Sequence, residues 1–304
     1  MTSSSSDGLH LAVTGASGLI GSALVPSLEA AGHRVLRVTR AVAGPGQTRW
    51  DPEKQTIDSA AFEGIDGAIH LAGENIAERW TEAHKRSILE SRREGTKLLA
   101  ETMAKLNPKP KFLIQASAVG IYGNRGSEPL TERSAPGEGF APEVAQIWEA
   151  SSKAAEEAGI RVARLRFGLV LTSAGGVLGK MLPPFKLGLG GKLGDGKQYM
   201  SWVALADLLA VVHRVIGTPE LTGPINVTSP NPVTNEEFTH TLGKVLNRPT
   251  SFAVPAMVLH AMFGQMAEEV LLGGARVLPE KLQQIGFPFR YTELEPALRA
   301  ALQD

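Results

Sequence analysis

The segment LAVTGASGLIGSAL, from Leu11 to Leu24, decides the fold. It starts as a short apolar run, passes through three glycines spaced three residues apart, and continues as an apolar helical stretch. In a strand–turn–helix unit, such glycines let the turn tighten and let the backbone approach a pyrophosphate, which the free N–H groups of the helix N-terminus attract. We therefore predict a dinucleotide site at this turn. The residues predicted to bind are Gly15, Ser17, Gly18, Leu19, Ile20 and Gly21.

Four more apolar runs follow this segment, and helical stretches separate them. Strands that alternate with helices build right-handed βαβ units, which place a parallel sheet between two layers of helices. The predicted fold is therefore α/β: a Rossmann-type doubly wound parallel sheet with a smaller, helix-rich C-terminal substrate domain. The predicted strands are 11–13, 35–38, 68–72, 112–116 and 162–167.

Helix signals and a change of composition predict how the chain is divided. Thr81 is a typical N-cap for a long helix, and residues 234–237 form a capping box for another. After Phe167 the chain becomes rich in glycine and proline, which predicts that it leaves the sheet. We expect a disordered tail over residues 1–9, a Rossmann domain over 10–172 with a returning segment at about 203–228, and a substrate domain over 173–202 and 229–304.

The overall composition argues against several classes of protein. The chain has 304 residues, with 31 Lys plus Arg and 31 Asp plus Glu, so no basic field exists to hold nucleic acid or an anionic membrane. Cysteine is absent, which removes disulfides, thiolate nucleophiles and Cys-bound zinc. None of the seven histidines lies four residues from another, and we expect no metal site.

The ends and the apolar runs of the chain bear on its location and partners. The first residues, MTSSSSDG, lack the basic start and apolar core of a signal peptide, and no run reaches the ~18 apolar residues of a membrane span. We expect a cytoplasmic protein with a small-molecule substrate, and neither nucleic acid nor a membrane as partner. Monomer and homodimer both stay open, because no expected helix carries an unambiguous apolar stripe.

The second predicted strand bears on the choice of cofactor. An NAD site usually has an acidic residue about 20 positions beyond the glycines, whereas an NADP site has an arginine nearby. No acid lies between Glu29 and Asp51, and Thr39 and Arg40 end the strand. Arg40 can pair with a 2′-phosphate and Thr39 can hydrogen-bond to it, which favours NADP (NADPH). The alternative is that the arginines of this strand are only solvated surface residues.

Motifs spread along the chain resemble those of known enzymes. The glycine segment, HLAG (70–73) and IYG (121–123) resemble extended short-chain dehydrogenases/reductases. Other segments look more closely like the epimerase-like subfamily that carries a C-terminal domain of unknown function. These are LAGENI (71–76), SR (91–92), ASAVGIYG (116–123), WEA (148–150), LRFGLVL (165–171), MSWVALADL (200–208) and LLGGARVLPEKLQQIGFPF (271–289), which together span nearly the whole chain.

The resemblance implies roles for residues at matching positions. The loop of Leu71, Ala72, Gly73, Glu74 and Asn75 would line the adenosine and ribose side of the cofactor. Ser117 would lie beside the nicotinamide, and Phe167, Gly168 and Leu169 would pass close to its amide. Gln198, Met200 and Trp202 would face the substrate cleft, although apolar residues near a domain junction, such as Trp202 and Phe167, more often serve in packing.

The stretch GEGFAPEVAQIWEASSKAAEEAG (137–159) departs from the pattern of the superfamily. There a tyrosine passes a proton to or from the substrate, and a lysine four residues later lowers its pKa and holds the ribose. Aligning the end of this helix with the family places Ala141 and Ala145 at the two positions, and neither can move a proton. Lys153 lies four residues after Glu149, and we predict a surface ion pair between them.

Ser117 and Tyr122 are the remaining candidates for catalysis. Both follow the predicted strand 112–116, at the sheet edge where open α/β proteins bind ligands. Ser117 is a poor proton donor without help, and Tyr122 can instead simply pack, in which case it would contact no substrate. Two functions stay open: an NADP-dependent oxidoreductase or epimerase-like enzyme with an unknown substrate, and a non-catalytic NADP(H)-binding sensor or interaction protein.

Overall fold

A computed structural model of the protein describes residues 8–303. Most of the predicted tail, residues 1–7, lies outside the described residues. Leu9 packs against the main core, and its N–H donates to Nδ1 of His33 at 3.1 Å. Residues 8 and 9, which the tail prediction included, therefore belong to the described structure.

Eight strands form one sheet: β1 (His10–Thr14), β2 (Arg34–Thr39), β3 (Gln47–Asp51), β4 (Thr56–Ile57), β5 (Gly67–His70), β6 (Phe112–Ala118), β8 (Arg161–Phe167) and β12 (Gly223–Val227). Their order is β12-β8-β6-β5-β1-β2-β3-β4, and only β3 and β4 pair antiparallel. The order reverses at β1, which lies between β5 and β2. Open α/β sheets bind ligands at the carboxyl ends of strands at such a switch point. The predicted α/β fold and all five predicted strands are confirmed.

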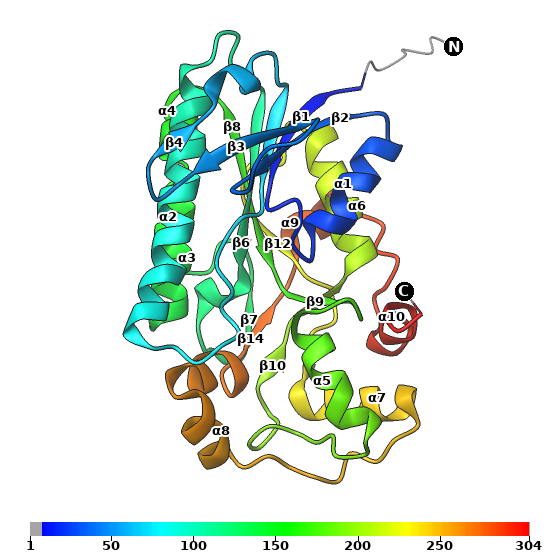
Figure 1. Ribbon diagram of the computed structural model, residues 1–304. Coiled ribbons are helices and arrows are strands. Elements are labelled where there is room, and N and C mark those ends of the chain that lie inside the picture. Colours follow the sequence, from blue (N-terminus) through cyan, green and yellow to red (C-terminus); the bar gives the residue numbers. More distant parts are fainter. Residues whose placement is uncertain (1–7, 304) are drawn as a thin grey trace, which may run out of the picture.

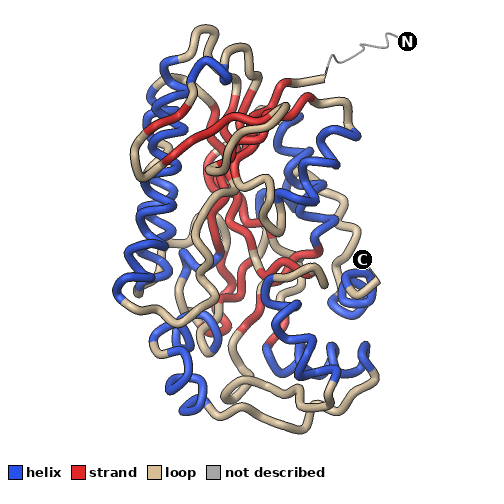
Figure 2. The backbone as a smooth tube through the Cα atoms, in the orientation of Figure 1, coloured by secondary structure: helices blue, strands red, loops and turns tan. Residues whose placement is uncertain are grey.

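Helices cover both faces of the sheet, as Figures 1 and 2 show. One face carries α1 (Gly21–Ala30), α6 (Leu205–Gly217) and the short α9 (Glu280–Gln284), which share one buried core cluster with β1 and β12. On the other side lie α2 (Glu82–Lys105), α3 (Phe140–Ala150) and α4 (Lys153–Glu157). Leu99 and Met103 of α2 and Ala155 of α4 are fully buried there. The sheet is thus enclosed, and its carboxyl edge remains the place for a ligand.

A smaller, helix-rich part extends beyond that edge (Figure 1). Trp202 and Phe238 lie in its core, which α5 (Gly176–Lys186), α7 (Asn235–Leu246) and α10 (Leu294–Ala301) surround, while α8 (Ala256–Phe263) lies at the outer end. Short strand pairs join β9 (Leu169–Leu171) to β11 (Trp202–Ala204), β10 (Tyr199–Met200) to β13 (Val233–Thr234), and β7 (Gly126–Leu130) to β14 (Ala275–Val277). Short helical turns are Ser59–Phe62, Val119–Tyr122 and Ala267–Leu271. Residues 229–304, which the sequence assigned to the substrate domain, are not confined to this smaller part, because α9 packs on β12 of the large sheet.

Two predicted helix starts are confirmed by their caps. The Thr81 side chain accepts the N–H of His84 at the start of α2, and Thr234 and Glu237 form the capping box of α7. The strands β3 and β12 were not predicted. Their sequences, QTRWD and GPINV, are too polar or too rich in glycine and proline to read as apolar runs.

Candidate functional site

The turn between β1 and α1 is built from glycines that neighbouring backbone crowds. Gly15 has a φ of +69°, and a Cβ there would lie 2.8 Å from the N atom of Ala72. A Cβ on Gly21 would overlap the carbonyl oxygen of Gly15. A Cβ on Gly18 would meet only that oxygen, at 3.3 Å. Geometry therefore requires glycine at 15 and 21, while Gly18 leaves the outer surface of the turn open.

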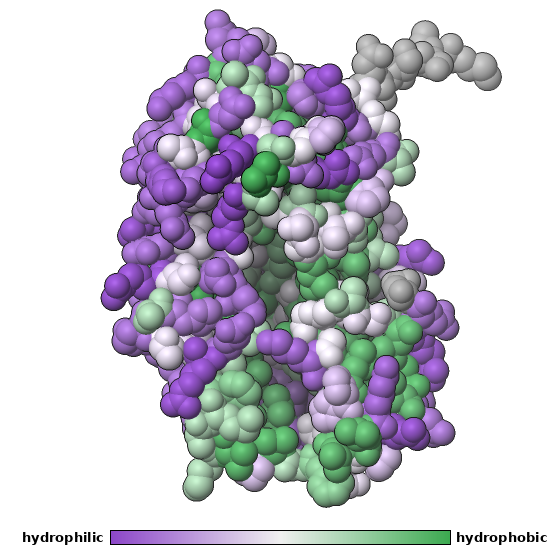
Figure 3. Space-filling model, in the orientation of Figure 1, coloured by the Kyte–Doolittle hydropathy of each residue, from purple (hydrophilic) through white to green (hydrophobic). Residues whose placement is uncertain are grey.

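The N–H groups of this turn suit a pyrophosphate. Gly18 donates to the carbonyl oxygen of Gly15 at 3.0 Å, which closes the turn. Among the described residues, the N–H groups of Ser17, Leu19 and Ile20 have no backbone acceptor. They precede the first residue of α1, where the helix dipole favours an anion. Figure 3 shows a hollow in the face of the molecule near the carboxyl edge of the sheet, and this hollow is the candidate site.

A buried histidine fixes the junction between the glycine turn and the loop after β5. The Thr14 hydroxyl accepts the N–H groups of Leu71 and Ala72 at 3.2 and 3.3 Å, so its own hydrogen goes to Nδ1 of His70, 2.7 Å away. Nδ1 is therefore an acceptor, and Nε2 carries the proton toward the Thr96 hydroxyl at 2.9 Å. Burial, followed by the charge of Arg92, lowers the pKa of His70 to about 3. His70 is thus a neutral structural clamp at the edge of the site.

The loop after β5 lies against the glycine turn. Leu71 and Ala72 are partly buried beside Gly15, and Gly73 is exposed. The N–H of Glu74 donates to the Ser91 hydroxyl at 3.1 Å. The Asn75 side chain is occupied locally, because its amide nitrogen donates to Glu78 and its oxygen accepts the N–H of Ala77. The first three residues of the loop are the best placed to contact a ligand in the hollow.

The end of β2 carries an arginine suited to a 2′-phosphate. Arg37 is committed to Glu29 at 2.7 Å, whereas Arg40 is exposed and has no carboxylate within 4 Å among the described residues. The Thr39 hydroxyl accepts the N–H of Ala41 at 3.1 Å. The neighbouring strand β3 places Arg49 directly beside Thr39 in register. Arg49 was missed because its strand was missed, and it is a second exposed cation at this strand end.

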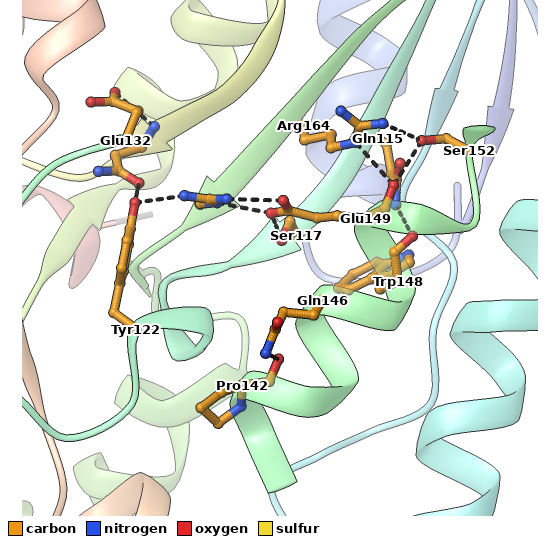
Figure 4. A network of polar contacts seen from close by, with 12 residues as sticks. Gln115, Ser117, Tyr122, Glu132, Pro142, Gln146, Trp148, Glu149, Ser152 and Arg164 are labelled. Atoms are coloured by element: carbon orange, nitrogen blue, oxygen red, sulfur yellow. Dashed lines mark hydrogen bonds and ion pairs between the residues drawn. The ribbon is translucent and has the colours of Figure 1, made fainter. Parts of the chain in front are cut away.

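A buried ion pair joins α3 to the end of β8 (Figure 4). Arg166 donates to both carboxylate oxygens of Glu149, at 2.8 and 2.9 Å, and the two side chains are only 8% and 13% exposed. The Ser117 hydroxyl donates to the same carboxylate at 2.7 Å. Burial alone would lower the pKa of Arg166, but the hydrogen bonds and charge of Glu149 raise it. This pair therefore stays ionised and holds the ends of β6 and β8 to α3.

The predicted surface pair between Glu149 and Lys153 is wrong. Lys153 is exposed and pairs with Glu157 at 3.0 Å instead. The helical spacing failed because α3 ends at Ala150 and α4 begins only at Lys153, so the two residues do not lie on one continuous helix. Glu149 faces the sheet, where Arg166 neutralises it.

The two candidate catalytic hydroxyls are both committed inside the protein. Tyr122 is fully buried, donates to Oδ1 of Asn226 at 2.7 Å and accepts from Arg166 at 2.8 Å. Burial raises the pKa of this hydroxyl, against the opposing charge of Arg166. Ser117 is 2% exposed and points to Glu149 (Figure 4). This arrangement argues against direct proton transfer by Tyr122 and makes Ser117 part of a fixed network.

The two alanines of α3 are packing residues. Ala145 is 3% exposed and packs with Ile121 and Tyr122, while Ala141 is partly buried in a cluster with Trp80. A Cβ added to Gly120 would lie 3.7 Å from the Cβ of Ala141, so the turn after β6 comes close to this helix. Apolar side chains therefore pack around Ala145 and Ala141 of α3.

The segment after β8 crosses the carboxyl edge with its backbone engaged. Gly168 donates to the carbonyl oxygen of Val227 and Leu169 to that of Ser201, and Phe167 packs against the main core. These three residues lie at the expected edge, but the two N–H groups are not free for a ligand. A Cβ on Gly168 would overlap the carbonyl oxygen of Ser201.

The three residues expected to face the substrate are mostly structural. Trp202 is fully buried, and its Nε1 donates to the carbonyl oxygen of Asn231 at 3.0 Å. Gln198 is 8% exposed and donates to two backbone carbonyl oxygens. Met200 is partly buried in the core of the smaller part. Packing and internal hydrogen bonds account for Trp202 and Gln198, and the Met200 sulfur accepts a hydrogen bond from the Asn235 side chain at 3.4 Å.

Residues 8–303 show neither a metal-binding cluster nor a membrane-spanning helix. No group of three or more His, Asp or Glu side chains in this range could hold a metal ion. None of the helices there is long and apolar enough to cross a membrane.

Comparison with known proteins gives two family matches. Residues 11–228 match the model of the NAD dependent epimerase/dehydratase family, and residues 254–301 match a domain of unknown function, DUF1731. An epimerase family protein of Mycobacterium tuberculosis is 42% identical over 290 residues, which cover 95% of this chain and 96% of that protein. The epimerase family protein YfhF of Bacillus subtilis is 36% identical, covering 97% of this chain and 99% of the relative.

A solved structure agrees over the same length. The crystal structure of the human epimerase family protein SDR39U1 with NADPH superposes with a TM-score of 0.90, at 32% sequence identity. The match covers 97% of this chain and 100% of the human one.

Proposed function

The chain belongs to the NAD dependent epimerase/dehydratase family, and on that basis we propose that it binds NADP(H) and is an epimerase-like oxidoreductase. The observation that carries the proposal is the glycine turn, whose three N–H groups at Ser17, Leu19 and Ile20 have no backbone acceptor among the described residues. The human relative was crystallised with NADPH, which supports the same cofactor here. Arg40 is exposed at the end of β2 and has no carboxylate within 4 Å among residues 8–303, which suits the 2′-phosphate that distinguishes NADP from NAD.

The residues of this chain would bind and orient, and the cofactor, when bound, supplies hydride chemistry. Ser17, Leu19 and Ile20 would hold the pyrophosphate, and Arg40 the 2′-phosphate. Thr14 and His70 would keep Leu71 and Ala72 in place at the edge of the hollow. The substrate is a small molecule that enters between the sheet edge and the smaller part. Tyr122 does not donate a proton to the substrate, because its hydroxyl donates its hydrogen to Asn226 and accepts a hydrogen bond from Arg166.

A second function is favoured by the helix α3. The alignment with the superfamily assigns Ala141 and Ala145 to the positions of the proton donor and the ribose-holding lysine, and Ser117 is tied to Glu149. A protein that binds NADP(H) and signals by a change of conformation needs neither group. This alternative shares the cofactor site with the first function and differs in chemistry alone.

A pair of glycine variants tests the binding, and a substrate screen separates the two functions. Gly18→Asp adds a carboxylate where the new Cβ would contact only the Gly15 carbonyl oxygen, at 3.3 Å, so a small shift of the turn should let it fold, and the carboxylate should repel the pyrophosphate. Gly217→Asp, at an exposed position with nothing within 4 Å of the added Cβ, is the matched control. NADPH fluorescence should change on binding to the wild type and to the control but not to Gly18→Asp. Oxidation of NADPH by any member of a panel of sugars and carbonyl compounds would favour the enzyme, while binding without turnover would favour the sensor.

A further inference from the structure

Arg92 of α2 is a buried cation next to the loop after β5. Its side chain is 9% exposed, and one of its nitrogens donates to the carbonyl oxygen of Ile88 at 3.2 Å. A Cβ added to Gly73 would lie 3.4 Å from the guanidinium carbon, so the cation sits directly beneath this exposed glycine. Burial lowers the pKa of Arg92 to about 10, and the charge of Glu74 opposes this only in part. The guanidinium remains charged at neutral pH.

The buried arginines Arg92 and Arg166 differ in whether a carboxylate compensates their charge. Arg166 has two short hydrogen bonds to Glu149, whereas no carboxylate among residues 8–303 lies within 4 Å of Arg92. A buried cation without a partner is costly, and buried charges in proteins are normally paired. The position of Arg92 therefore calls for an anion that is not part of the chain.

A second unpartnered donor lies beside it. The guanidinium carbon is 4.9 Å from the ring centroid of Trp148, whose buried Nε1 has no hydrogen-bond partner among the described residues. Trp148 is three residues after Ala145 on α3, close to the position that lacks the ribose-holding lysine. Donors from α2 and α3 thus lie together beside Gly73, and among the described residues the carbonyl oxygen of Ile88 is the only acceptor that either of them has.

We propose that Arg92 and Nε1 of Trp148 form an oxyanion-binding site beneath Gly73. The ligand group is a phosphate or a carboxylate, supplied either by bound NADP(H) or by the substrate. A guanidinium with free N–H donors, stacked on an indole, is preorganised for such a group. The inference goes beyond the proposed function, because it assigns an anion site that the glycine turn and Arg40 do not provide.

Variants at neighbouring positions test this site. Arg92→Met removes the charge and keeps an unbranched side chain, and Arg92→Lys keeps the charge. Arg93→Met is the matched control, because Arg93 is exposed on the same helix and pairs with Glu94. The probes are NADPH, followed by fluorescence, and inorganic phosphate, followed by its effect on the thermal midpoint of the protein without cofactor. A charged hydrogen bond typically changes affinity about 10- to 100-fold, so Arg92→Met should weaken at least one probe by that factor.

The outcomes separate the sources of the anion from a purely structural role. If Arg92→Met binds NADPH more weakly, and the affinity of Arg92→Lys is closer to that of the wild type, the anion at this site is a phosphate of the cofactor. If Arg92→Met binds NADPH as the wild type does but is no longer stabilised by inorganic phosphate, the anion at this site comes from the substrate. Without ligand, Arg92→Met should be as stable as wild type or more so, since it removes an uncompensated charge. A lower thermal midpoint with both probes unchanged would overturn the proposal. If the wild type does not bind NADPH, the proposed function fails, and the phosphate measurement alone decides this inference.

Discussion

Lowering the pH should destabilise the protein through His70, because the fold requires this side chain to be neutral. Its Nδ1 accepts the hydrogen of Thr14, and a proton there would face another hydrogen. Burial lowers its folded-state pKa to about 3, with the charge of Arg92 as the second cause, whereas the unfolded value is about 6.5. A folded-state pKa below the unfolded one means that the stability is fully present above pH 6.5. It is lost as the pH falls from about 6.5 toward 3.

The size of the effect follows from these two values. At pH 5 the unfolded chain binds a proton that folded His70 does not, and ~1.5 pH units at ~1.36 kcal/mol each give about 2 kcal/mol. Urea unfolding at pH 7.5 and pH 5 measures it in the wild type and in His70→Gln, whose amide can accept from Thr14 and donate to Thr96. The wild type should lose about 2 kcal/mol more than the variant between the two pH values. Equal losses in the two proteins would refute a neutral, buried His70.

Two substitutions on α3 test how that helix is held. Glu149→Ala should destabilise the protein by about 3–5 kcal/mol, because it leaves Arg166 buried without its carboxylate. Adding Arg166→Met should recover part of that loss. If Glu149→Ala costs no more stability than breaking an exposed ion pair does, the ion pair between Glu149 and Arg166 is not buried. Ala145→Lys should lower the thermal midpoint, because overpacking a filled site costs about 1–3 kcal/mol. Lys153→Ala is the control and should leave the midpoint unchanged, because it removes only the exposed partner of Glu157. An Ala145→Lys variant as stable as wild type would show that this face of α3 is open.

Local signals in the sequence were enough to predict the sheet and the glycine turn. The five short apolar runs became β1, β2, β5, β6 and β8, because buried parallel strands are rich in apolar residues. Thr81 and the capping box at Thr234 marked helix starts, since caps act within one turn. The strands β3 and β12 lack such signals, because their sequences are polar or contain glycine and proline, and missing β3 also hid Arg49.

The polar interior of the site could not be predicted in the same way. The partner of Glu149 is Arg166, which becomes its neighbour only once β8 lies beside β6 under α3. The i,i+4 spacing predicted an ion pair between Glu149 and Lys153, but α3 ends at Ala150, so the two residues do not lie on one helix. The resemblance implied that Trp202 faces the substrate cleft, whereas Trp202 is fully buried in a core that helices far along the chain complete.

Calorimetric titration with NADPH and NADH tests the proposed function most directly. We predict that the wild type binds NADPH at least about tenfold more tightly than NADH, because Arg40 adds a charged hydrogen bond to the 2′-phosphate. Arg40→Gln should lose most of this preference while binding NADH as before. No binding of NADPH, or equal affinity for the two nucleotides in the wild type, would contradict an NADP(H) site at the end of β2.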